Sequence, residues 1–366
     1  MLNFLMQLIP TAIILGFLIF IHEFGHYLAC LWSGVRVEKF SIGFGPEIIK
    51  WTRQETVYAI SLIPFGGFVK PAGESFAELE GRAPAAGDFL AAPKVKRLII
   101  LAAGVLMNYV VAFVLFVFVF WTGHPVLKAK IGGFVSGFPA EASDLKVGDE
   151  VISINGKLVK DWQEMTMSIF ENKKSDLTLG VRRENHDLQV VIKPKTSEGT
   201  NVFGEKKQIS RIGVMPANEY GFEKYNLAES IQNSFLTTAN LAVMTYKSLW
   251  YLVTGRMSVK TLSGPIGIMV MTGNAARAGI SALLQLTAVI SISLAVINLL
   301  PIPALDGGHI FFLLIGAIFR RDVSAKVQDR VTQVGFTLLM ALMVFVVYND
   351  LVNLGFFNKI KAIFGG

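Results

Sequence analysis

The sequence contains one cysteine, Cys30, among its 366 residues. A single cysteine excludes an internal disulfide bond and any zinc cluster that is built from several cysteines. Basic residues are also absent from the N-terminal stretch, where the first Lys or Arg is Arg36. A cleaved signal peptide should begin with a cationic segment, so we expect the apolar N-terminal stretch to be a permanent membrane span.

Charged residues are missing from several long stretches, and hydrophobic residues make up 52% of the chain. A soluble domain rarely reaches that fraction, and a helix that crosses the hydrocarbon core of a bilayer requires about 20 apolar residues. The stretches with few or no ionisable residues and with this length are 5–29, 98–121, 280–300 and 334–357. The sequence therefore predicts a polytopic α-helical membrane protein with about four transmembrane helices.

The net charge of +7 does not indicate a nucleic-acid partner, because the basic residues gather beside the predicted spans. Lys94, Lys96 and Arg97 precede the second span, and Arg320 and Arg330 lie in the connection between the third and fourth. Lys and Arg next to spans mark the cytoplasmic side. We expect both connections to be cytoplasmic, both termini to be outside, and the lipid bilayer to be the surrounding partner.

Between the first two spans, short runs of strand-forming residues at 37–42 and 56–63 are bounded by Gly and Pro. They predict a small membrane-associated β-rich loop. Apolar backbone at membrane depth is tolerated only where protein or a water-filled cavity covers it. The following residues 72–92 are rich in Ala, Gly and Glu, and we expect a mobile loop there.

The middle of the chain has the composition of a soluble domain. Segments 151–154, 177–181 and 188–192 predict strands, and 162–171 predicts a helix. Residues 227–254 carry apolar side chains at helical spacing among many polar ones, which favours an amphipathic helix in the membrane plane over a fifth span. We therefore predict four regions: the first half of the membrane core (1–123), an extracytoplasmic domain (124–218), an amphipathic helix with a linker (219–279), and the second half of the membrane core (280–366).

A metal-binding pattern interrupts the first apolar stretch in the form His22-Glu23-Phe24-Gly25-His26. Residues four apart lie on one face of a helix, so both imidazoles can reach one metal ion. Glu23 is offset from that face and fits a role beside the metal's water. Ionisable residues inside a span are costly and by default mark a function. The alternative is a pair of buried histidines that bond neighbouring helices, which leaves Glu23 without a purpose in lipid.

A catalytic zinc ion needs a third protein ligand and one open position. The candidate is Asp306, which follows the two prolines of the segment 298–309 at the end of the third span. Pro301 and Pro303 should end the helix, and Gly307 and Gly308 should let the backbone turn sharply.

The sequence leaves other readings of this segment open. An Asp flanked by Pro and Gly is often only a turn residue. His309 could complete the site in place of Asp306, orient it from behind, or be structural.

The two motifs together resemble the site-2 protease family of intramembrane zinc metalloproteases, of the bacterial RseP type. That family pairs HExxH on one span with NxxPxPxLDG on a later span, as in 22–26 and 298–307 here. The order of parts agrees over essentially the whole chain. The resemblance implies that His22, His26 and Asp306 bind Zn²⁺, that Glu23 is the general base, and that Asn298 helps to hold the substrate.

Two further segments carry the resemblance. The family often has GPxxN on its second core span, and 104–108 reads GVLMN with the proline missing. Asn108 is thus a second predicted substrate-binding residue, with a structural bond to a neighbouring helix as the alternative. Residues 137–142 and 145–156 resemble a bacterial PDZ domain, and 124–218 has room for a single one. Whether it binds free C-termini or screens substrates by size stays open.

The predicted function is hydrolysis of peptide bonds in or near the transmembrane segments of single-span proteins, within regulated intramembrane proteolysis. By resemblance, the substrates are anti-sigma factors or remnant signal peptides, and the location is the bacterial inner membrane with the N-terminus and PDZ domain extracytoplasmic. The chain has no recognisable motif for a serine or cysteine nucleophile. The rival classes are a transporter with a metal or proton site and a non-catalytic scaffold. The sequence shows only four predicted spans and no duplicated halves, which argues against a transporter. A scaffold would leave Glu23 unexplained.

Overall fold

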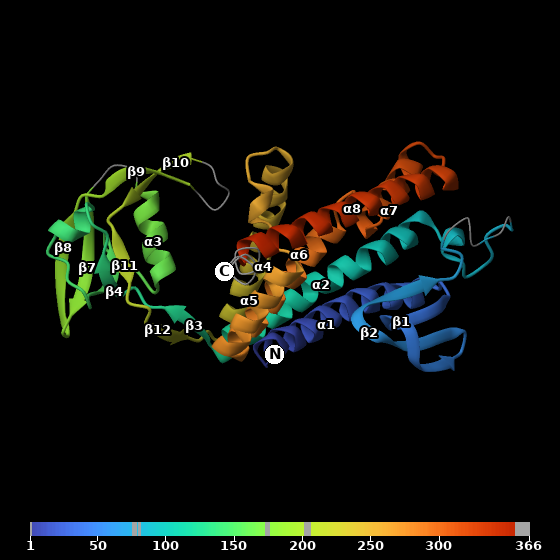
Figure 1. Cartoon of the computed structure of the whole chain (residues 1–366), viewed down its shortest axis with the longest axis horizontal. Helices are drawn as coiled ribbons and strands as arrows, with labels where there is room; N and C mark the ends of the chain where they lie inside the picture. Colours follow the sequence, from blue (N-terminus) through green and yellow to red (C-terminus); the bar gives the residue numbers. More distant parts are fainter. Residues whose placement is uncertain (1, 75–78, 80–81, 173–175, 201–205, 356–366) are drawn as a thin grey trace, which may run out of the picture. The chain divides into compact units, whose positions relative to one another are not determined.

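The computed structural model describes residues 2–74, 79, 82–172, 176–200 and 206–355, and it divides into two units (Figure 1). The first unit comprises Met1–Val119, Ala228–Lys247 and Val259–Gly366, and the second comprises Phe120–Leu227 and Ser248–Ser258. Most secondary-structure elements lie within one unit, and two helices continue across the division between the units.

Apolar helices form most of the first unit. The helices that are long and apolar enough to cross a membrane are Met6–Ser33 within α1 (Leu2–Ser33), α2 (Lys94–Thr122), α6 (Ile280–Asn298) and Lys326–Asn353 within α8 (Ala325–Asn353). Among the residues that the structure describes, four helices have the length and composition of a membrane span, as predicted. The bounds differ most for the last span, which was predicted at 334–357. Helix α8 begins earlier, at Ala325, because the polar residues before 334 are also helical.

The first unit also contains α5 (Pro265–Ala278), α7 (Asp306–Ile318) and residues 228–247 of α4 (Leu227–Val253). The bounds of α4 agree with the predicted helix 227–254. The other two helices were not predicted, since their residues were assigned to connections. Pro265 stands in the first turn of α5, where its missing N–H costs nothing. Helix α7 is apolar but has only 13 residues, too few to span a bilayer.

Strands β1 (Val37–Arg53) and β2 (Thr56–Pro71) form an antiparallel hairpin between α1 and α2. Both strands are longer than predicted and are bent by register shifts. As a result, Phe40 in the first half of β1 pairs with Tyr58 on one side and with Val69 on the other. The outer edges of this small sheet are the end of β1 and the end of β2, residues 49–53 and 67–71.

The hairpin is fastened to α1 by side chains. The hydroxyl groups of Tyr27 on α1 and Tyr58 on β2 are 2.6 Å apart, and the ring of Phe40 packs against both. Part of the predicted mobile loop, residues 75–78 and 80–81, lies outside the described residues. The described part ends in a short 3₁₀ helix, η1 (Phe89–Ala91).

Asp88 anchors this loop to the end of α1. Its side chain is fully buried and accepts hydrogen bonds from Arg36 Nη2 (2.9 Å) and Arg82 Nη1 (2.6 Å). The Arg82 guanidinium, the Ala85 N–H and Arg36 lower the pKa of Asp88 to about 2. The described part of the loop is therefore held by ion pairs, in contrast to the expectation of a mobile segment.

The second unit is mainly β-structure around one helix. A sheet with the order β6-β5-β7-β8 packs with α3 (Trp162–Glu171), which coincides with the predicted helix. The strands are β3 (His124–Leu127), β4 (Ile131–Phe134), β5 (Glu150–Ile154), β6 (Lys157–Leu158), β7 (Leu177–Arg183), β8 (His186–Ile192), β9 (Lys195–Thr200), β10 (Lys206–Arg211), β11 (Val214–Pro216) and β12 (Tyr220–Glu223).

Local sequence explains the ends of these elements. Asp161 caps α3 by accepting a hydrogen bond from the Glu164 N–H at 2.7 Å.

The second unit has one apolar core, in which Ile131, Met165 and Leu179 are fully buried. Strand β12 pairs with β3, so this unit extends past the predicted range 124–218 on both sides.

Candidate active site

Helix α1 presents His22 and His26 on one face, as their spacing of four residues predicts. Both side chains are buried, and their Nε2 atoms lie 3.2 Å apart. Gly25 lets α1 approach α2 closely, because a Cβ at that position would lie 2.6 Å from the carbonyl oxygen of Ala103. The imidazoles therefore face α2 at short range.

Gly104 on α2 provides the space that the two imidazoles occupy. A Cβ at position 104 would lie 2.3 Å from Nε2 of His26 and 2.8 Å from Cε1 of His22. Any other residue there would displace one or both rings. This role of Gly104 could not be predicted from the sequence, although Gly104 opens the segment 104–108 that contains Asn108.

Asp306 is the first residue of α7, and its carboxylate meets the two histidines. Helix α6 ends at Asn298 before the two prolines, as expected. The predicted reason for the following glycines was wrong: the left-handed backbone is at Ala304 (φ 89°), while Gly307 and Gly308 lie in the helix. A Cβ on Gly307 would lie 2.2 Å from the carbonyl oxygen of Leu300, so the glycine serves close packing.

The three ligand atoms form a triangle of nearly equal sides. Asp306 Oδ2 lies 3.0 Å from Nε2 of His22 and 3.5 Å from Nε2 of His26, and the two nitrogens are 3.2 Å apart. Zinc bonds of ~2.0–2.1 Å in a tetrahedron place ligand atoms ~3.3 Å from each other. The described residues contain one such group of three or more ligands. The donor set and its spacing both fit a tetrahedral zinc ion with one position left for a water molecule.

The surroundings of the triangle also favour a cation. Oδ2 of Asp306 is buried and accepts no hydrogen bond within the described part of the chain. Nδ1 of His26 lies 2.7 Å from the carbonyl oxygen of Ile100, which can only accept, so the ring proton is on Nδ1. The lone pair of His26 Nε2 is thereby directed at the centre of the triangle.

Glu23 lies next to this triangle and is held by the hairpin. Its Oε2 accepts a hydrogen bond of 3.0 Å from the backbone N–H of Val69, at the outer edge of β2. Sequence analysis could not identify this contact, because a backbone N–H carries no sequence signal. The carboxylate lines cavities on two sides of the site.

The predicted substrate-binding asparagines both lie beside His22. Asn298 is partly exposed, and its Nδ2 is 3.4 Å from His22 Nε2. Asn108 is 1% exposed, and its Nδ2 is 3.4 Å from His22 Nδ1. The structure thus brings every predicted site residue into one place, although their roles stay predictions.

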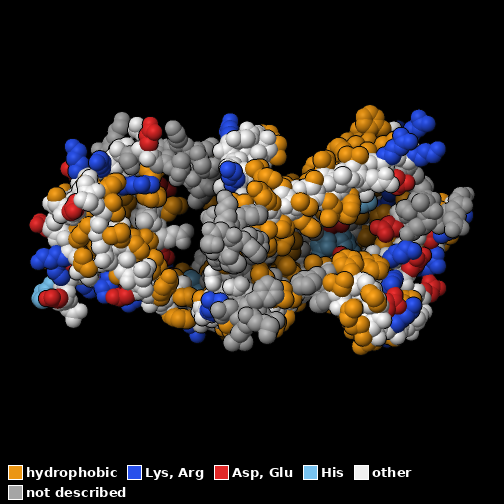
Figure 2. Space-filling model, in the orientation of Figure 1, with side chains coloured by type: hydrophobic (Ala, Val, Ile, Leu, Met, Phe, Trp, Pro, Cys, Tyr) orange, Lys and Arg blue, Asp and Glu red, His pale blue; other side chains and the backbone are white. Residues whose placement is uncertain are grey.

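Two groups of cavities flank the triangle. A cavity of about 420 Å³ lies between the site and the hairpin and is lined by His22, Glu23, Gly67, Asn298 and Asp306, among others. In the space-filling view, histidine atoms are visible at the bottom of a hollow between apolar surfaces (Figure 2).

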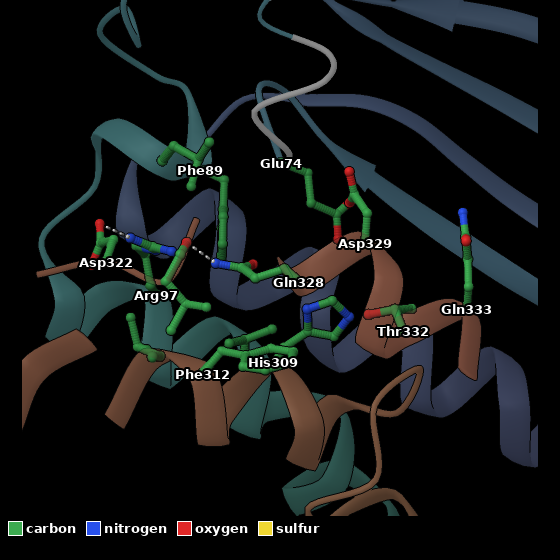
Figure 3. Close-up of a pocket in the computed structure, with 14 residues that line it drawn as sticks. Glu74, Phe89, Arg97, His309, Phe312, Asp322, Gln328, Asp329, Thr332 and Gln333 are labelled. Carbon is green, nitrogen blue, oxygen red and sulfur yellow. Dashed lines mark hydrogen bonds and ion pairs between the residues drawn. The ribbon is translucent and has the colours of Figure 1, made fainter. Parts of the chain in front are cut away.

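On the other side, a hollow of about 140 Å³ that contains Glu23 and His309 adjoins a polar cavity of about 450 Å³. The residues that line both are Glu74, Phe89, Leu101 and His309. Side chains from α2, α7 and α8, including Arg97, Gln328 and Asp329, line the larger one (Figure 3). His309 therefore lies in the hollow next to the triangle and is not part of the ligand group.

Comparison with known proteins gives a consistent result. A family model described as Peptidase family M50 matches residues 10–342. A protein of Agrobacterium fabrum that is named as a zinc metalloprotease is 32% identical over 365 residues, with 95% of this chain and 96% of the relative covered. A Campylobacter jejuni protein with the same kind of name is 33% identical over 350 residues (94% and 93% covered). The regulator of sigma-W protease RasP of Bacillus subtilis is 30% identical over 428 residues (96% and 99% covered).

Proposed function

Because this chain belongs to peptidase family M50 and is a zinc metalloprotease, we propose that it hydrolyses peptide bonds in or near the transmembrane segments of single-span membrane proteins. One observation carries the proposal: His22 and His26 stand with Glu23 on α1, a helix of membrane-spanning length, and Asp306 at the start of α7 completes the candidate zinc triangle. A soluble protease has no need to place these residues in such a helix.

Each site residue has a distinct part in the proposed reaction. His22, His26 and Asp306 hold the zinc ion, which when bound lowers the pKa of water towards ~7 and polarises a carbonyl group. Glu23 takes a proton from the attacking water and delivers it to the leaving amine. The Val69 N–H occupies one carboxylate oxygen of Glu23 and keeps the other free to point at the site.

The substrate must be extended before it is cut, because a helix hides its carbonyl groups in its own hydrogen bonds. We propose that the extended segment adds as a further strand at the edge formed by residues 67–71 of β2. Gly66 and Gly67 of β2 line the same cavity as His22, Asp306 and Asn298. Asn298 is partly exposed there and can donate its amide to a substrate carbonyl group.

The protein is a membrane protein, and we place it in the bacterial inner membrane with its N-terminus outside. The orientation rests on the basic residues beside α2 and between α7 and α8. The second unit would then be an extracytoplasmic PDZ-like domain that selects substrates, by binding a C-terminus or by excluding large ectodomains. The relative named regulator of sigma-W protease RasP supports anti-sigma factors as one proposed substrate class, and remnant signal peptides are the other.

The decisive experiment compares wild type with Glu23→Gln in detergent on a single-span test substrate, with the zinc content measured for both. Glutamine retains an oxygen that accepts from Val69, so the fold and the zinc site should persist. We expect cleavage by wild type, none by the variant, and about one zinc per chain in both. Equal cleavage by both proteins would refute the role of Glu23, and zinc without any cleavage would favour a metal-binding non-enzyme.

The strand-addition step has its own test. Proline at Phe68 or Lys70 alters the edge beside Glu23, while proline at Lys50 alters the opposite edge of the same sheet. Cleavage of a membrane substrate should fall for the first pair and stay near wild type for Lys50→Pro. Equal turnover by all three well-folded variants would contradict the proposed binding edge.

A further inference from the structure

The two histidine ligands differ in what holds their second ring nitrogen. Nδ1 of His26 donates to the Ile100 carbonyl oxygen, and this fixes the tautomer that ligates through Nε2. Among the described residues, no backbone carbonyl oxygen forms a hydrogen bond with Nδ1 of His22. Its neighbour is the side-chain amide of Asn108 on α2, at 3.4 Å.

The orientation of that amide decides whether His22 can bind a metal. If Nδ2 of Asn108 donates to Nδ1 of His22, the ring proton must be on Nε2 and would point into the ligand triangle. If the amide is turned by 180°, Oδ1 accepts the Nδ1–H, and the lone pair of Nε2 faces Asp306. Only the second arrangement makes His22 a ligand.

The burial of Asn108 supports the turned amide. The side chain is 1% exposed, and its Oδ1 accepts no hydrogen bond from the residues that the structure describes. One amide atom therefore lacks a partner in either orientation, so the contact with His22 determines which orientation is stable. His22 would hold a zinc ion through the lone pair of Nε2 only in the tautomer with its proton on Nδ1, and Oδ1 of Asn108 is then the neighbour that accepts this proton.

We infer that Asn108 is a positioning residue that fixes the tautomer and ring orientation of His22 through its Oδ1, and that it does not hold the substrate. The inference rests on the proposed zinc site. It departs from the substrate-binding role that sequence analysis predicted, because a side chain that is 1% exposed offers little surface to a peptide. Asn298, which is partly exposed at the end of α6, keeps the substrate-holding role.

A second contact of Asn108 provides the control. Its backbone carbonyl oxygen accepts a hydrogen bond of 2.8 Å from Ser291 Oγ, and this bond links α2 with α6. Ser291→Ala removes the link between the helices but leaves the Asn108 amide in place. The two contacts therefore separate a packing role from a role at His22.

The experiment is a zinc titration of the full-length protein in detergent against a competing chromophoric chelator, with kcat and KM measured on a single-span substrate. Asn108→Ala and Asn108→Ser should each lower the zinc affinity 10- to 100-fold, since neither side chain reaches Nδ1 of His22. Asn108→Asp restores an acceptor oxygen and should bring the zinc affinity back to within a few-fold of wild type. Ser291→Ala should keep the wild-type zinc affinity.

Several results would overturn the inference. Unchanged zinc affinity with a raised KM in Asn108→Ala would make Asn108 a substrate-binding residue. Equal losses of zinc affinity in Asn108→Ala and Ser291→Ala, or no recovery in Asn108→Asp, would make its role one of packing. Failure of the zinc site itself is distinguishable, because wild type would then bind no zinc in the same titration.

Discussion

Two aspartates of the first unit that bury carboxylate oxygens, Asp306 and Asp350, are held in opposite ways. Asp350 on α8 is 4% exposed, and its two oxygens accept hydrogen bonds from the backbone N–H groups of Gly264 (3.0 Å) and Gly267 (2.9 Å). These N–H groups belong to the start of α5, where the helix dipole favours an anion. Asp306 has a buried oxygen that faces two imidazoles and accepts no hydrogen bond among the described residues.

The comparison shows how one residue type serves structure in one place and chemistry in another. A buried carboxylate is costly unless donors or a cation compensate it. Backbone N–H groups compensate Asp350 completely, so that residue can close the contact between α8 and α5. Asp306 instead faces the Nε2 atoms of His22 (3.0 Å) and His26 (3.5 Å), and a cation in the triangle would compensate its charge. This difference supports the proposal that Asp306 is a zinc ligand.

The largest expected difference between the two aspartates is in catalysis. Asp306→Ala removes a zinc ligand and should lower the cleavage rate at least ~10³-fold, with most of the bound zinc lost. Asp350→Ala should retain about one zinc per chain and cleave within about tenfold of wild type. Zinc analysis of the purified variants and cleavage of a single-span substrate check this. A zinc-free Asp350→Ala would contradict the assignment.

The second largest difference between the two aspartates should be in how the Tm of their variants responds to removal of zinc. A ligand that binds only the folded state stabilises it by ~4 kcal/mol when its concentration is 1,000 times the Kd. Chelation should therefore lower the Tm of wild type and of Asp350→Ala. The Tm of Asp306→Ala should not respond, because its site is already disabled. A chelator response in Asp306→Ala equal to that of wild type would place the stabilising metal elsewhere.

Asp350→Ala should cost about 2 kcal/mol of stability, because the helix cap is lost and two N–H groups of α5 are left without acceptors. Thermal unfolding in detergent measures the loss. Asp329→Ala on the exposed part of the same helix is the matched control and should be close to neutral. If both variants lose the same stability, the capping contact has no special value.

The smallest effect concerns Asp88, a third aspartate, which arginines hold outside the membrane. Its folded pKa of about 2 lies below the ordinary value of 3.8, so its stabilisation is complete above about pH 4 and is lost as the pH falls towards 2. The Tm of wild type should decline in that window. The decline should be shallower in Asp88→Asn and in Arg82→Gln, and identical slopes in all three would exclude this ion pair as the cause.

The sequence was sufficient for the parts of the fold and site that depend on local geometry. The spacing of His22 and His26 on one helix face and the lengths of the four spans follow from helix periodicity and bilayer thickness. The predicted helix 162–171 agrees with α3 because its start is also determined locally, by the capping side chain of Asp161.

The remainder depends on contacts between distant segments. The predicted strands at 37–42 and 56–63 were too short because the bent hairpin lets one half of β1 pair on both sides. The N–H of Val69 and the carbonyl of Ile100 hold Glu23 and His26, but backbone groups have no sequence signature. Gly307 was misjudged as a turn residue, since only the packed structure shows the Leu300 carbonyl against it.

Gly104 also has a practical meaning for those who want to capture substrates. A methyl group at that position would enter the space of both imidazoles while His22, Glu23, His26 and Asp306 all remain in the chain. Gly104→Ala would thus be an inactive enzyme with an intact strand edge and an intact set of polar groups. Such a protein is a trap, able to hold an uncut membrane peptide long enough for it to be crosslinked and identified.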